Sequence, residues 1–314
     1  MKITVASPTY RRAWSLPYVL EGLRSQSRPP DEVLIVLKPS GDGSEEVLSR
    51  YEEKLPLRVI VQRQGGVAQA IQEAIDAATG DLLLFIDDDA VPEEKWVEKY
   101  ERFFEEIPDA GGASGAVIPA RLVGGRPEPL EVLEGAMGIA EGARVRREVS
   151  WRRPLPELRD YCEFLSLSGF NVGRNCNILG EVYYKSTSLW GANMAFRTKA
   201  VAGAPLGRLY EGSRKGFHSE SLLAYVAVKR GYVTYKIIGP EKSPKVLHLE
   251  GESLTRGRGF LHEFWLHYDR VRTFHRLRRL GAKVSYGAYV MACLATARKH
   301  TLPRILATIY AQIR

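Results

Sequence analysis

The stretch Gly80-Asp81-Leu82-Leu83-Leu84-Phe85-Ile86-Asp87-Asp88-Asp89-Ala90-Val91-Pro92 places five apolar residues directly before three consecutive carboxylates. The apolar run, 82–86, has the length and composition of a strand buried on both faces. Because an uncompensated buried charge costs several kcal/mol, the carboxylates must lie where the strand leaves the core, facing water or a cation. Side chains alternate along an extended backbone, so Asp87 and Asp89 share one side and Asp88 faces the other. Two carboxylates on one side suit a divalent cation that also binds phosphate oxygens; the alternative is a polar loop that caps a helix beginning near Pro92.

The segments around this strand alternate between strand and helix patterns. Strands are predicted at 2–7, 33–37, 57–61 and 82–86, and helices at 16–25, 44–54 and 67–78. Gly80 fits the position that follows a helix end. This order predicts an α/β fold with a parallel sheet and right-handed crossovers. Further strands are predicted at 113–118, 181–184 and 245–247, and 226–235 has the pattern of a helix end, a turn and a strand.

Size and composition indicate a globular protein. The 314 residues are 45% apolar and 26% charged, which is ordinary for a folded chain and unlike a disordered one. The N-terminal sequence has no signal-peptide core, and no run of about 18 apolar residues occurs, so a cytoplasmic location is expected. Cys162, Cys176 and Cys293 lack CxxC spacing and are expected to be reduced thiols. Scarce Asn and Gln beside plentiful Arg, Glu and Tyr are typical of a thermophile.

The net charge of +8 belongs to the C-terminal part of the chain. From Arg256 to Arg314 there are 12 Lys and Arg against only Glu263 and Asp269, a balance of +10, whereas the remainder has 33 basic and 35 acidic residues. Helical apolar stripes run through 260–277, 284–297 and 302–313, the last with its large apolar residues on one face. Three arrangements of such a tail are open. It packs on the rest of the chain, which is the usual fate of apolar stripes; it forms an oligomer interface, such as that of a homodimer; or it lies on an anionic membrane. No nucleic-acid-binding motif accompanies the charge, so nucleic acid is not an expected partner.

Several pieces of this sequence, taken in their order, resemble the family 2 glycosyltransferases. They are SPTYRR at 7–12, the Gly65-Gly66 pair that opens a helix, ATGDLLLFIDDDAVP at 78–92 with its Asp-x-Asp, WGANMAFR at 190–197, and RGYVTYK at 230–236 followed by PKVLH, which ends on His248. No single piece is specific to the family, but the ordered set is. It covers residues 1 to about 250, roughly four-fifths of the chain.

The resemblance implies the GT-A fold, an α/β fold in which helices flank a Rossmann-like, mostly parallel sheet. The glycosyltransferase domain would span 1–255, with a nucleotide-binding half to about 112 and an acceptor half over 113–255, and 256–314 would form a basic helical appendage. The implied activity is inverting, metal-dependent transfer of a sugar from a nucleoside diphosphate donor to an acceptor hydroxyl. Because the tail suggests an interface, the expected acceptor is a saccharide, and specifically a lipid-linked one of cell-envelope or N-glycan assembly. The protein would then be peripheral on the cytoplasmic face of the membrane.

For the metal site, the resemblance implies that Asp89 is a direct ligand of Mn²⁺ or Mg²⁺. Asp87 would bind the same ion or the donor's ribose, and Asp88 belongs to the same donor-binding set. His248 matches a third metal ligand, with a structural His at a strand end as the alternative. A divalent ion at this place would stabilise the charge that accumulates on the diphosphate leaving group.

The attacking hydroxyl needs a base, and the resemblance assigns that role to Glu220, at the start of the helix before the Gly231-Tyr232 turn. An ordinary first-turn Glu, favoured by the helix dipole, is the alternative. The acidic set is incomplete in this chain because Ser219 and Leu222 stand where the family has further acids.

The remaining donor contacts are implied for Pro8, Thr9, Tyr10 and Arg12, for the backbone at Gly66, and for Trp190 and Asn193 near the donor sugar and acceptor. Tyr10 and Trp190 have packing roles as alternatives. Leu37-Lys38 replaces the acidic residues that usually read the base, with Asp42 as a substitute, and Ile71-Gln72 replaces Arg-Asn. Guanine and thymine therefore stay open beside uracil.

Two other functions compete with this interpretation. The replaced acids at 37, 38, 219 and 222 fit a catalytically inactive sugar-nucleotide-binding or scaffold protein. A sugar-nucleotide nucleotidyltransferase is the other, but such enzymes carry a Gly-rich, Arg/Lys-containing loop after the first strand, and Pro8-Thr9-Tyr10 is not that loop.

Overall fold

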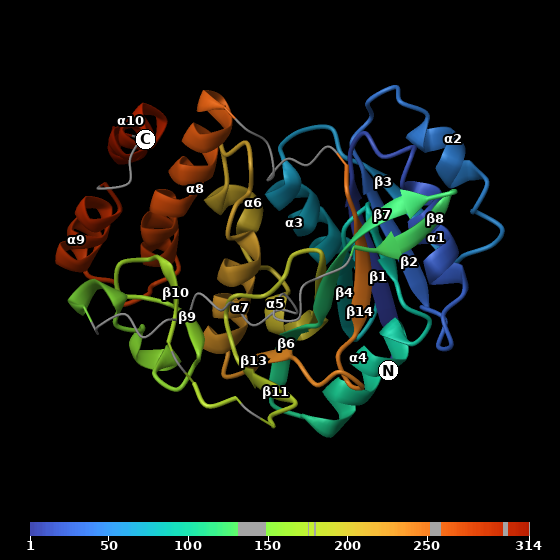
Figure 1. Ribbon diagram of the computed structural model, residues 1–314, viewed down its shortest axis with the longest axis horizontal. Helices are drawn as coiled ribbons and strands as arrows, with labels where there is room; N and C mark the ends of the chain where they lie inside the picture. Colours follow the sequence, from blue (N-terminus) through green and yellow to red (C-terminus); the bar gives the residue numbers. More distant parts are fainter. Residues whose placement is uncertain (131–148, 175, 179, 252–258, 298–300, 314) are drawn as a thin grey trace.

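A computed structural model describes residues 1–130, 149–174, 176–178, 180–251, 259–297 and 301–313. At its centre is an eight-stranded sheet in the order β11-β13-β6-β12-β4-β1-β2-β3, with helices on both faces (Figure 1). The predicted α/β architecture is confirmed.

The N-terminal part alternates strand and helix as the sequence predicts. Its elements are β1 (Ile3–Thr9), α1 (Leu16–Arg24), β2 (Glu32–Leu37), α2 (Ser44–Ser49), β3 (Leu57–Val61), α3 (Val67–Ala77) and β4 (Leu82–Ile86). All neighbouring strands among these four are parallel. Their carboxyl ends, at Thr9, Leu37, Val61 and Ile86, therefore meet at one edge of the sheet, where α/β folds bind ligands.

The other half of the sheet is mixed. β12 (Asn193–Arg197) lies antiparallel between β4 and β6 (Ala110–Ser114), β13 (Val233–Ile237) is parallel to β6, and β11 (Tyr183–Lys185) is antiparallel to β13. Because β12 runs against β4, the residues just before β12 lie beside the residues just after β4. Trp190 and the acidic turn are thereby brought to the same edge.

A second sheet, in the order β5-β14-β7-β8, crosses the exit of β4 and corrects two predictions. Its strands are β5 (Ala90–Pro92), β14 (Lys245–Leu249), β7 (Ala116–Val123) and β8 (Arg126–Pro129). The helix predicted near Pro92 begins only at Trp96, as α4 (Trp96–Glu106), because 90–92 pairs with β14 instead. The strand predicted at 113–118 is split at Gly115, where an added Cβ would collide with the carbonyl of Pro244.

Gly80 serves a purpose different from the predicted helix end. It does not adopt a positive φ, and α3 ends at Ala78 in an extended conformation. A Cβ on Gly80 would lie 2.6 Å from the backbone nitrogen of Thr4 and 2.8 Å from the carbonyl oxygen of Leu82. The glycine is required because two strands approach closely here.

Alternating side chains of the central strands divide the interior into two cores. Val5, Val33 and Leu84 face α1 and α4, whereas Ala6, Leu34 and Phe85 face α3 and α7 (Ser219–Lys229). Both sets are buried, which is why these strands are apolar throughout. Two short helices, α5 (Thr198–Val201) and α6 (Leu206–Leu209), complete the second layer, together with 3₁₀ turns at Ser150–Arg152 and Pro156–Leu158.

A small hairpin of β9 (Glu163–Leu165) and β10 (Asn171–Gly173) contains a disulfide that the sequence analysis missed. Cys162 and Cys176 are bonded, with their Cα atoms 5.8 Å apart, and Cys293 is a free thiol. The prediction of three reduced thiols is wrong, because a hairpin in the fold closes the 14-residue separation. Cysteine content therefore gives no support to the expected cytoplasmic location.

The C-terminal helices are α8 (Phe260–Arg279), α9 (Tyr286–Ala297) and α10 (Leu302–Ile313), at one end of the molecule (Figure 1). They build a third core with Trp151 and Phe170, and Leu277 of α8 reaches into the core beneath α3 and α7. The predicted domain boundary at 255/256 lies outside the described residues. No helix in the described part of the chain is long and apolar enough to cross a membrane.

The packing of α9 and α10 is the reverse of the packing expected for apolar stripes. The buried residues of α10 are Pro303, Ala307 and Ala311, and those of α9 include Ala288 and Ala292. The large side chains point outward, with Leu302 62%, Ile309 54% and Ile313 79% exposed on α10 and Leu294 63% exposed on α9. The small residues of α10 allow it to pack closely on α8, and the large apolar residues named above are left to solvent.

Candidate active site

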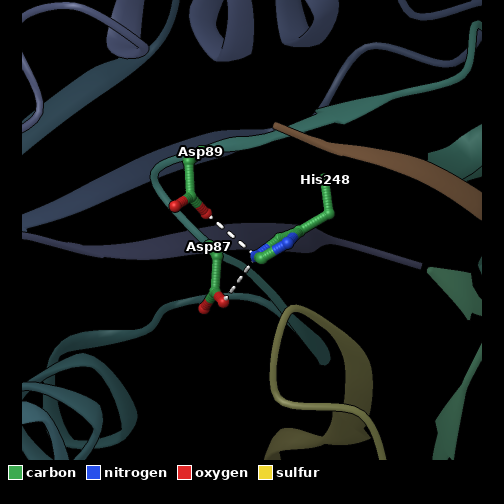
Figure 2. Close-up of side chains that lie close together, drawn as sticks. All are labelled: Asp87, Asp89 and His248. Atoms are coloured by element: carbon green, nitrogen blue, oxygen red, sulfur yellow. Dashed lines mark ion pairs between the residues drawn. The ribbon is translucent and has the colours of Figure 1, made fainter. Parts of the chain in front are cut away.

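Two carboxylates and one imidazole converge where β4 ends (Figure 2). Asp89 Oδ1 lies 3.0 Å and Asp87 Oδ2 3.6 Å from Nε2 of His248. The β5–β14 pairing produces this convergence, because it sets His248 opposite Ala90, one residue after the acidic turn. One ligand atom from each residue lies within 4.8 Å of the other two. The alternation predicted for Asp87 and Asp89 is therefore seen, with His248 on the same side.

The charge state of His248 is set by these carboxylates. Burial alone would lower its pKa, but the hydrogen bonds that His248 donates to Asp87 and Asp89, together with their negative charge, raise the pKa to about 9. An imidazolium thus offsets carboxylate charge at neutral pH. A divalent cation would take the same place relative to the two carboxylates.

Asp88 faces the other way and binds the loop that follows β1. Its Oδ2 accepts the N–H of Tyr10 at 3.0 Å, and its Oδ1 accepts Nε of Arg12 at 3.0 Å. Burial raises the pKa of Asp88, Arg12 lowers it, and the neighbouring Asp89 and Asp87 raise it again, so the net shift is upward. Arg12 also reaches Asp89 Oδ2 at 3.2 Å. The structure thus engages both Asp88 and Arg12 with protein groups and joins the β1 loop to the acidic turn.

The predicted base, Glu220, lies half-buried in the first turn of α7. The pKa of Glu220 is raised to about 7, mainly by burial and also by the negative charge of Asp87, while hydrogen bonds from the backbone and Ser219 and the positive charge of Lys236 act to lower it. Glu220 is therefore near enough to Asp87 for the charge of that carboxylate to act on it. A carboxyl group with a pKa near neutrality is suited to exchanging protons at physiological pH.

Lys236 is a site residue that the sequence analysis did not single out. It is 5% exposed on β13, and its Nζ lies 2.8 Å from Glu163 and 4.9 Å from the ring centre of Trp190. Trp190 is 44% exposed, so the alternative of a core Trp is wrong. The sequence feature that could have revealed Lys236 is a lysine inside the mostly apolar strand 233–237, since a buried cation needs a partner.

The predicted donor-binding residues of the β1 loop differ in what they can offer. Thr9 is buried, its hydroxyl donates to the carbonyl of Ser7, and its own carbonyl accepts the N–H of Lys38. Pro8 precedes it as a half-buried residue of β1. The ring of Tyr10 is half-buried, with Arg11 5.2 Å and Lys38 5.7 Å from its centre. Tyr10 therefore presents an aromatic face between two cations, an arrangement that suits a base or phosphate.

Asn193 does not take the predicted role of contacting donor or acceptor. It is fully buried, and its Oδ1 accepts hydrogen bonds from Trp96 at 2.8 Å and Tyr100 at 2.7 Å. Its Nδ2 donates to the carbonyls of Ala116 and Pro244, both at 2.8 Å. All hydrogen-bonding positions of the amide are used, so this residue joins β12 to α4 and the second sheet instead.

Asp42 is likewise committed to the fold. It accepts hydrogen bonds from the N–H of Ala13 and from the N–H and hydroxyl of Ser44. Burial acts to raise its pKa, but these hydrogen bonds dominate and lower the pKa to about 2. Both carboxylate oxygens of Asp42 already accept hydrogen bonds within the protein. Asp42 is therefore not free to contact a base in place of the missing acidic residues.

A cleft of about 550 Å³ opens beside the start of α3. Gly66 lines one wall, and the opposite wall belongs to 207–216, including Arg208, Tyr210 and Ser213. A Cβ on Gly66 would meet the carbonyl oxygens of Ser213 at 3.7 Å and Arg214 at 3.9 Å, which are ordinary contacts, so this glycine is not required by packing. Gly66 is thus placed where a ligand in the cleft could reach its backbone.

The fold and this site define the class of protein. The chain is similar over 99% of its length to the mannosyltransferase PcManGT of Pyrobaculum calidifontis, solved with GDP-Man and Mn²⁺, with a TM-score of 0.52, 18% identity and 80% of that chain covered. It is similar over 87% of its length to GalNAc-T7, solved with UDP, GalNAc and Mn²⁺, with a TM-score of 0.58, 12% identity and 47% of that chain covered. These likenesses show the GT-A glycosyltransferase fold.

The sequence places the chain within that class. Residues 4–167, half of the chain, match the model of glycosyl transferase family 2, and the protein belongs to this family. A glucosyl-dolichyl phosphate glucuronosyltransferase of Haloferax volcanii is 30% identical over 126 residues, which are 38% of this chain and 39% of the relative. The matched stretch thus spans about two-fifths of the relative's length.

Proposed function

We propose that this protein is an inverting glycosyltransferase that moves a sugar from a nucleoside diphosphate donor to an acceptor hydroxyl. The observation that carries the proposal is the convergence of Asp87, Asp89 and His248 at the carboxyl end of β4, with the carboxyl group of Glu220 interacting with Asp87. An oxygen-rich cation site and a carboxyl group of near-neutral pKa are the two devices that single-displacement sugar transfer needs.

The ligand atoms of the cluster fit a divalent ion. Asp87, Asp89 and His248 would hold Mn²⁺ or Mg²⁺, because two carboxylates and one imidazole match the oxygen and nitrogen ligands of these ions. When bound, the ion would supply positive charge to the diphosphate leaving group. Arg12 holds Asp88 and Asp89 in place for this purpose.

Glu220 is the proposed base. It would accept the proton of the acceptor hydroxyl as that oxygen attacks the anomeric carbon from the side opposite the diphosphate, which inverts the configuration. Trp190 offers an exposed aromatic face to a sugar, and Lys236 beneath it restrains the ring. Pro8, Thr9, Tyr10 and Gly66 would contact the nucleotide through the β1 loop and the start of α3.

The test is a thermal-shift panel of UDP, GDP, dTDP and CMP, with and without Mn²⁺, on wild type and Asp89→Ala. A ligand at a hundredfold excess over its dissociation constant stabilises the folded state by about 2.7 kcal/mol. We expect one diphosphate to raise the melting temperature only with metal and only in wild type. No shift with any nucleotide would refute the donor site.

Turnover separates this proposal from its rivals. Release of the nucleoside diphosphate from its sugar nucleotide, lost in Glu220→Gln, is the expected result. Metal-dependent binding without turnover under any acceptor would favour the inactive binding protein. Formation of a sugar nucleotide from a sugar phosphate and a nucleoside triphosphate would instead favour the nucleotidyltransferase.

We also propose that the acceptor is lipid-linked and that α9 and α10 lie on an anionic membrane. Their outward faces expose Met291 and Leu294 on α9 and Ile305 and Ile309 on α10. The exposed cations Arg278, Arg279 and Lys283 stand at the turn between α8 and α9. Large apolar side chains beside cations are the composition of helices that lie in a membrane interface.

Vesicle flotation tests the membrane proposal. Vesicles of phosphatidylcholine with and without phosphatidylglycerol are the probes, and Ile305→Ser with Ile309→Ser is the variant. The matched control is Val61→Ser, since Val61 is 52% exposed on β3. Binding to anionic vesicles that only the α10 variant loses is expected. A dimer in solution that the α10 variant disperses, without vesicle binding, would overturn the proposal in favour of a homodimer.

A further inference from the structure

A buried ion pair on α8 contacts the loop between α6 and α7. Asp269 is 0% and Arg276 2% exposed, and Nη2 of Arg276 lies 2.6 Å from Oδ1 of Asp269. Arg276 also donates from Nη1 to the carbonyl of Asp269 and from Nε to the carbonyl of Leu209, both at 3.0 Å. A fully buried ion pair contributes little net stability, because its attraction only offsets its desolvation. Its contacts with other segments therefore indicate what it does.

The second oxygen of Asp269 binds the loop between α6 and α7. Oδ2 accepts the hydroxyl of Ser213 at 2.7 Å and the N–H of Phe217 at 3.1 Å. The guanidinium of Arg276 stacks on the ring of Tyr210, 3.7 Å from its centre. Both members of the pair thus hold the same loop, 209–217.

Phe217 is fixed at both of its backbone polar groups. Asp269 accepts its N–H, and the hydroxyl of Tyr210 donates to its carbonyl at 2.8 Å. The next residue, His218, has a φ of +68°, a left-handed conformation that is uncommon for a residue other than glycine. Such a conformation persists when its surroundings determine it. His218 is the N-cap of α7, and Glu220 follows two residues later.

We infer that Asp269, Arg276 and Tyr210 are positioning residues that set the place of Glu220 through the backbone of Phe217. The inference rests on the proposed role of Glu220 as base. It makes α8 a functional part of the acceptor side, so the helix does more than begin an appendage. In Figure 1, α8 stands directly beside α6 and α7. None of the three residues needs to touch the acceptor hydroxyl.

The same loop forms a wall of the cleft beside α3. Tyr210, Gly212, Ser213 and Gly216 line that wall. Displacement of the loop would move Glu220 and the cleft wall together. The expected signature is therefore a fall in kcat with a smaller rise in KM for the donor, because a misplacement of about 1 Å at a reacting group costs about 100-fold in rate.

Tyr210→Phe is the sharpest test, since it removes the hydroxyl that holds the carbonyl of Phe217 and keeps the ring under Arg276. The assay is release of nucleoside diphosphate from the sugar nucleotide whose base the thermal-shift panel selects. We expect kcat to fall by about 10-fold or more, towards the 100-fold limit of a misplaced group. The rising limb of the pH–rate profile should also move, because Glu220 changes its surroundings.

Asp269→Asn and Ser213→Ala extend the series. The amide removes the charge that pairs with Arg276, and Ser213→Ala removes one hydrogen bond to Asp269 while leaving the pair intact. If Asp269→Asn does not fold, Tyr210→Phe and Ser213→Ala decide the matter. The matched control is Thr273→Val, whose buried hydroxyl donates only within α8, to the carbonyl of Asp269. The control is expected to keep the wild-type kcat and pH profile.

The outcomes separate the inference from the proposed function. If Glu220→Gln keeps wild-type turnover, the base assignment fails, and the inference fails with it. If Glu220→Gln is inactive while Tyr210→Phe and Ser213→Ala match Thr273→Val in kcat and in pH profile, the base assignment stands and the positioning role is refuted. The positioning role would also be refuted if the three variants lost kcat but kept the wild-type pH profile, and Thr273→Val lost kcat to the same extent.

Discussion

Two groups of charged side chains lie at low exposure in this molecule, and they differ in how they are enclosed. At the end of β4, Asp87 is 48% exposed through its side chain while Asp89 and His248 are 6% and 11% exposed, so the group opens to solvent on one side. On α8, Asp269 and Arg276 are sealed at 0% and 2%. The first group has room for a ligand, whereas the second can contact only the protein.

The difference in enclosure indicates different roles for the charged residues at the end of β4 and on α8. An open cluster with excess negative charge can exchange a proton on His248 for a metal ion, since both neutralise the carboxylates. A sealed pair has matched charges, and its hydrogen bonds to other segments all go to one loop. We therefore expect substitutions in the open cluster to act on binding and substitutions in the sealed pair to act on geometry.

The largest effect is expected for Asp89→Ala. The change removes a carboxylate that contacts both His248 and Arg12, so it removes the charge that a divalent ion needs at this point. Turnover should fall by about 1,000-fold, the upper end of the cost of losing one group that stabilises charge developing in the transition state. Steady-state rates across a Mn²⁺ titration provide the measurement. Recovery of wild-type rates at high Mn²⁺ would show that Asp89 only raises affinity for the ion.

Glu220→Gln should come next, with opposite effects on activity and stability. Loss of a general base costs about 100- to 10,000-fold in rate. The pKa of Glu220 is raised from 4.5 to about 7, so the folded state binds more protons than the unfolded state between these values, and stability falls as pH rises through that window. At pH 8, Gln avoids this cost and should stabilise the protein by about 1–3 kcal/mol.

Denaturant unfolding of wild type and Glu220→Gln from pH 4.5 to 8, with chelator present, measures the second effect. The difference between the two proteins should be absent at pH 4.5 and largest at pH 8. Glu211→Gln is a suitable control, because Glu211 is an exposed carboxylate of the same loop region. A constant difference across the pH range would mean that Glu220 titrates as an ordinary surface carboxylate.

Much of the open cluster could be predicted from local sequence, and little of the sealed pair. Five apolar residues followed by DDD indicate a strand ending in a polar site, and period-two alternation places Asp87 and Asp89 on one side. His248 was reached only through the resemblance, because its position depends on the pairing of β14 with β5 across about 150 residues. For the same reason the sequence analysis predicted a helix near Pro92, where the chain forms β5.

The sealed pair and the disulfide lacked a local signal. Asp269 and Arg276 are seven residues apart in a helix rich in Arg, and nothing in that pattern distinguishes Arg276 from its exposed neighbours Arg278 and Arg279. The pairing of Cys162 with Cys176 depends on the β9–β10 hairpin. Asn193 was misassigned because a motif match does not show whether an amide is already fully hydrogen-bonded.

A third kind of constraint, the Cys162–Cys176 disulfide, should affect stability more than activity. Cys162 adjoins Glu163, whose carboxylate binds Lys236 beneath Trp190. Replacing both cysteines by Ser should lower the free energy of unfolding by about 3 kcal/mol, as expected for a loop of this length. Melting with and without reductant provides the check, with Cys293→Ser as the control. No change on reduction would mean that the hairpin is held by its other contacts.

The smallest change in stability is expected where the sealed pair is replaced by apolar residues of similar size, Asp269→Leu with Arg276→Met. Such replacements are often neutral or stabilising, whereas Arg276→Met alone should cost about 3–5 kcal/mol because it leaves Asp269 as an unpaired buried charge. The double variant should nevertheless keep the low kcat of Tyr210→Phe, since Phe217 and Ser213 have lost their acceptor. Unfolding curves and turnover, measured on the same samples, separate the two roles. Wild-type turnover in a stable double variant would show that packing alone holds the loop. The open cluster and the sealed pair would then differ in their exposure to solvent, and the sealed pair would have no role in positioning Glu220.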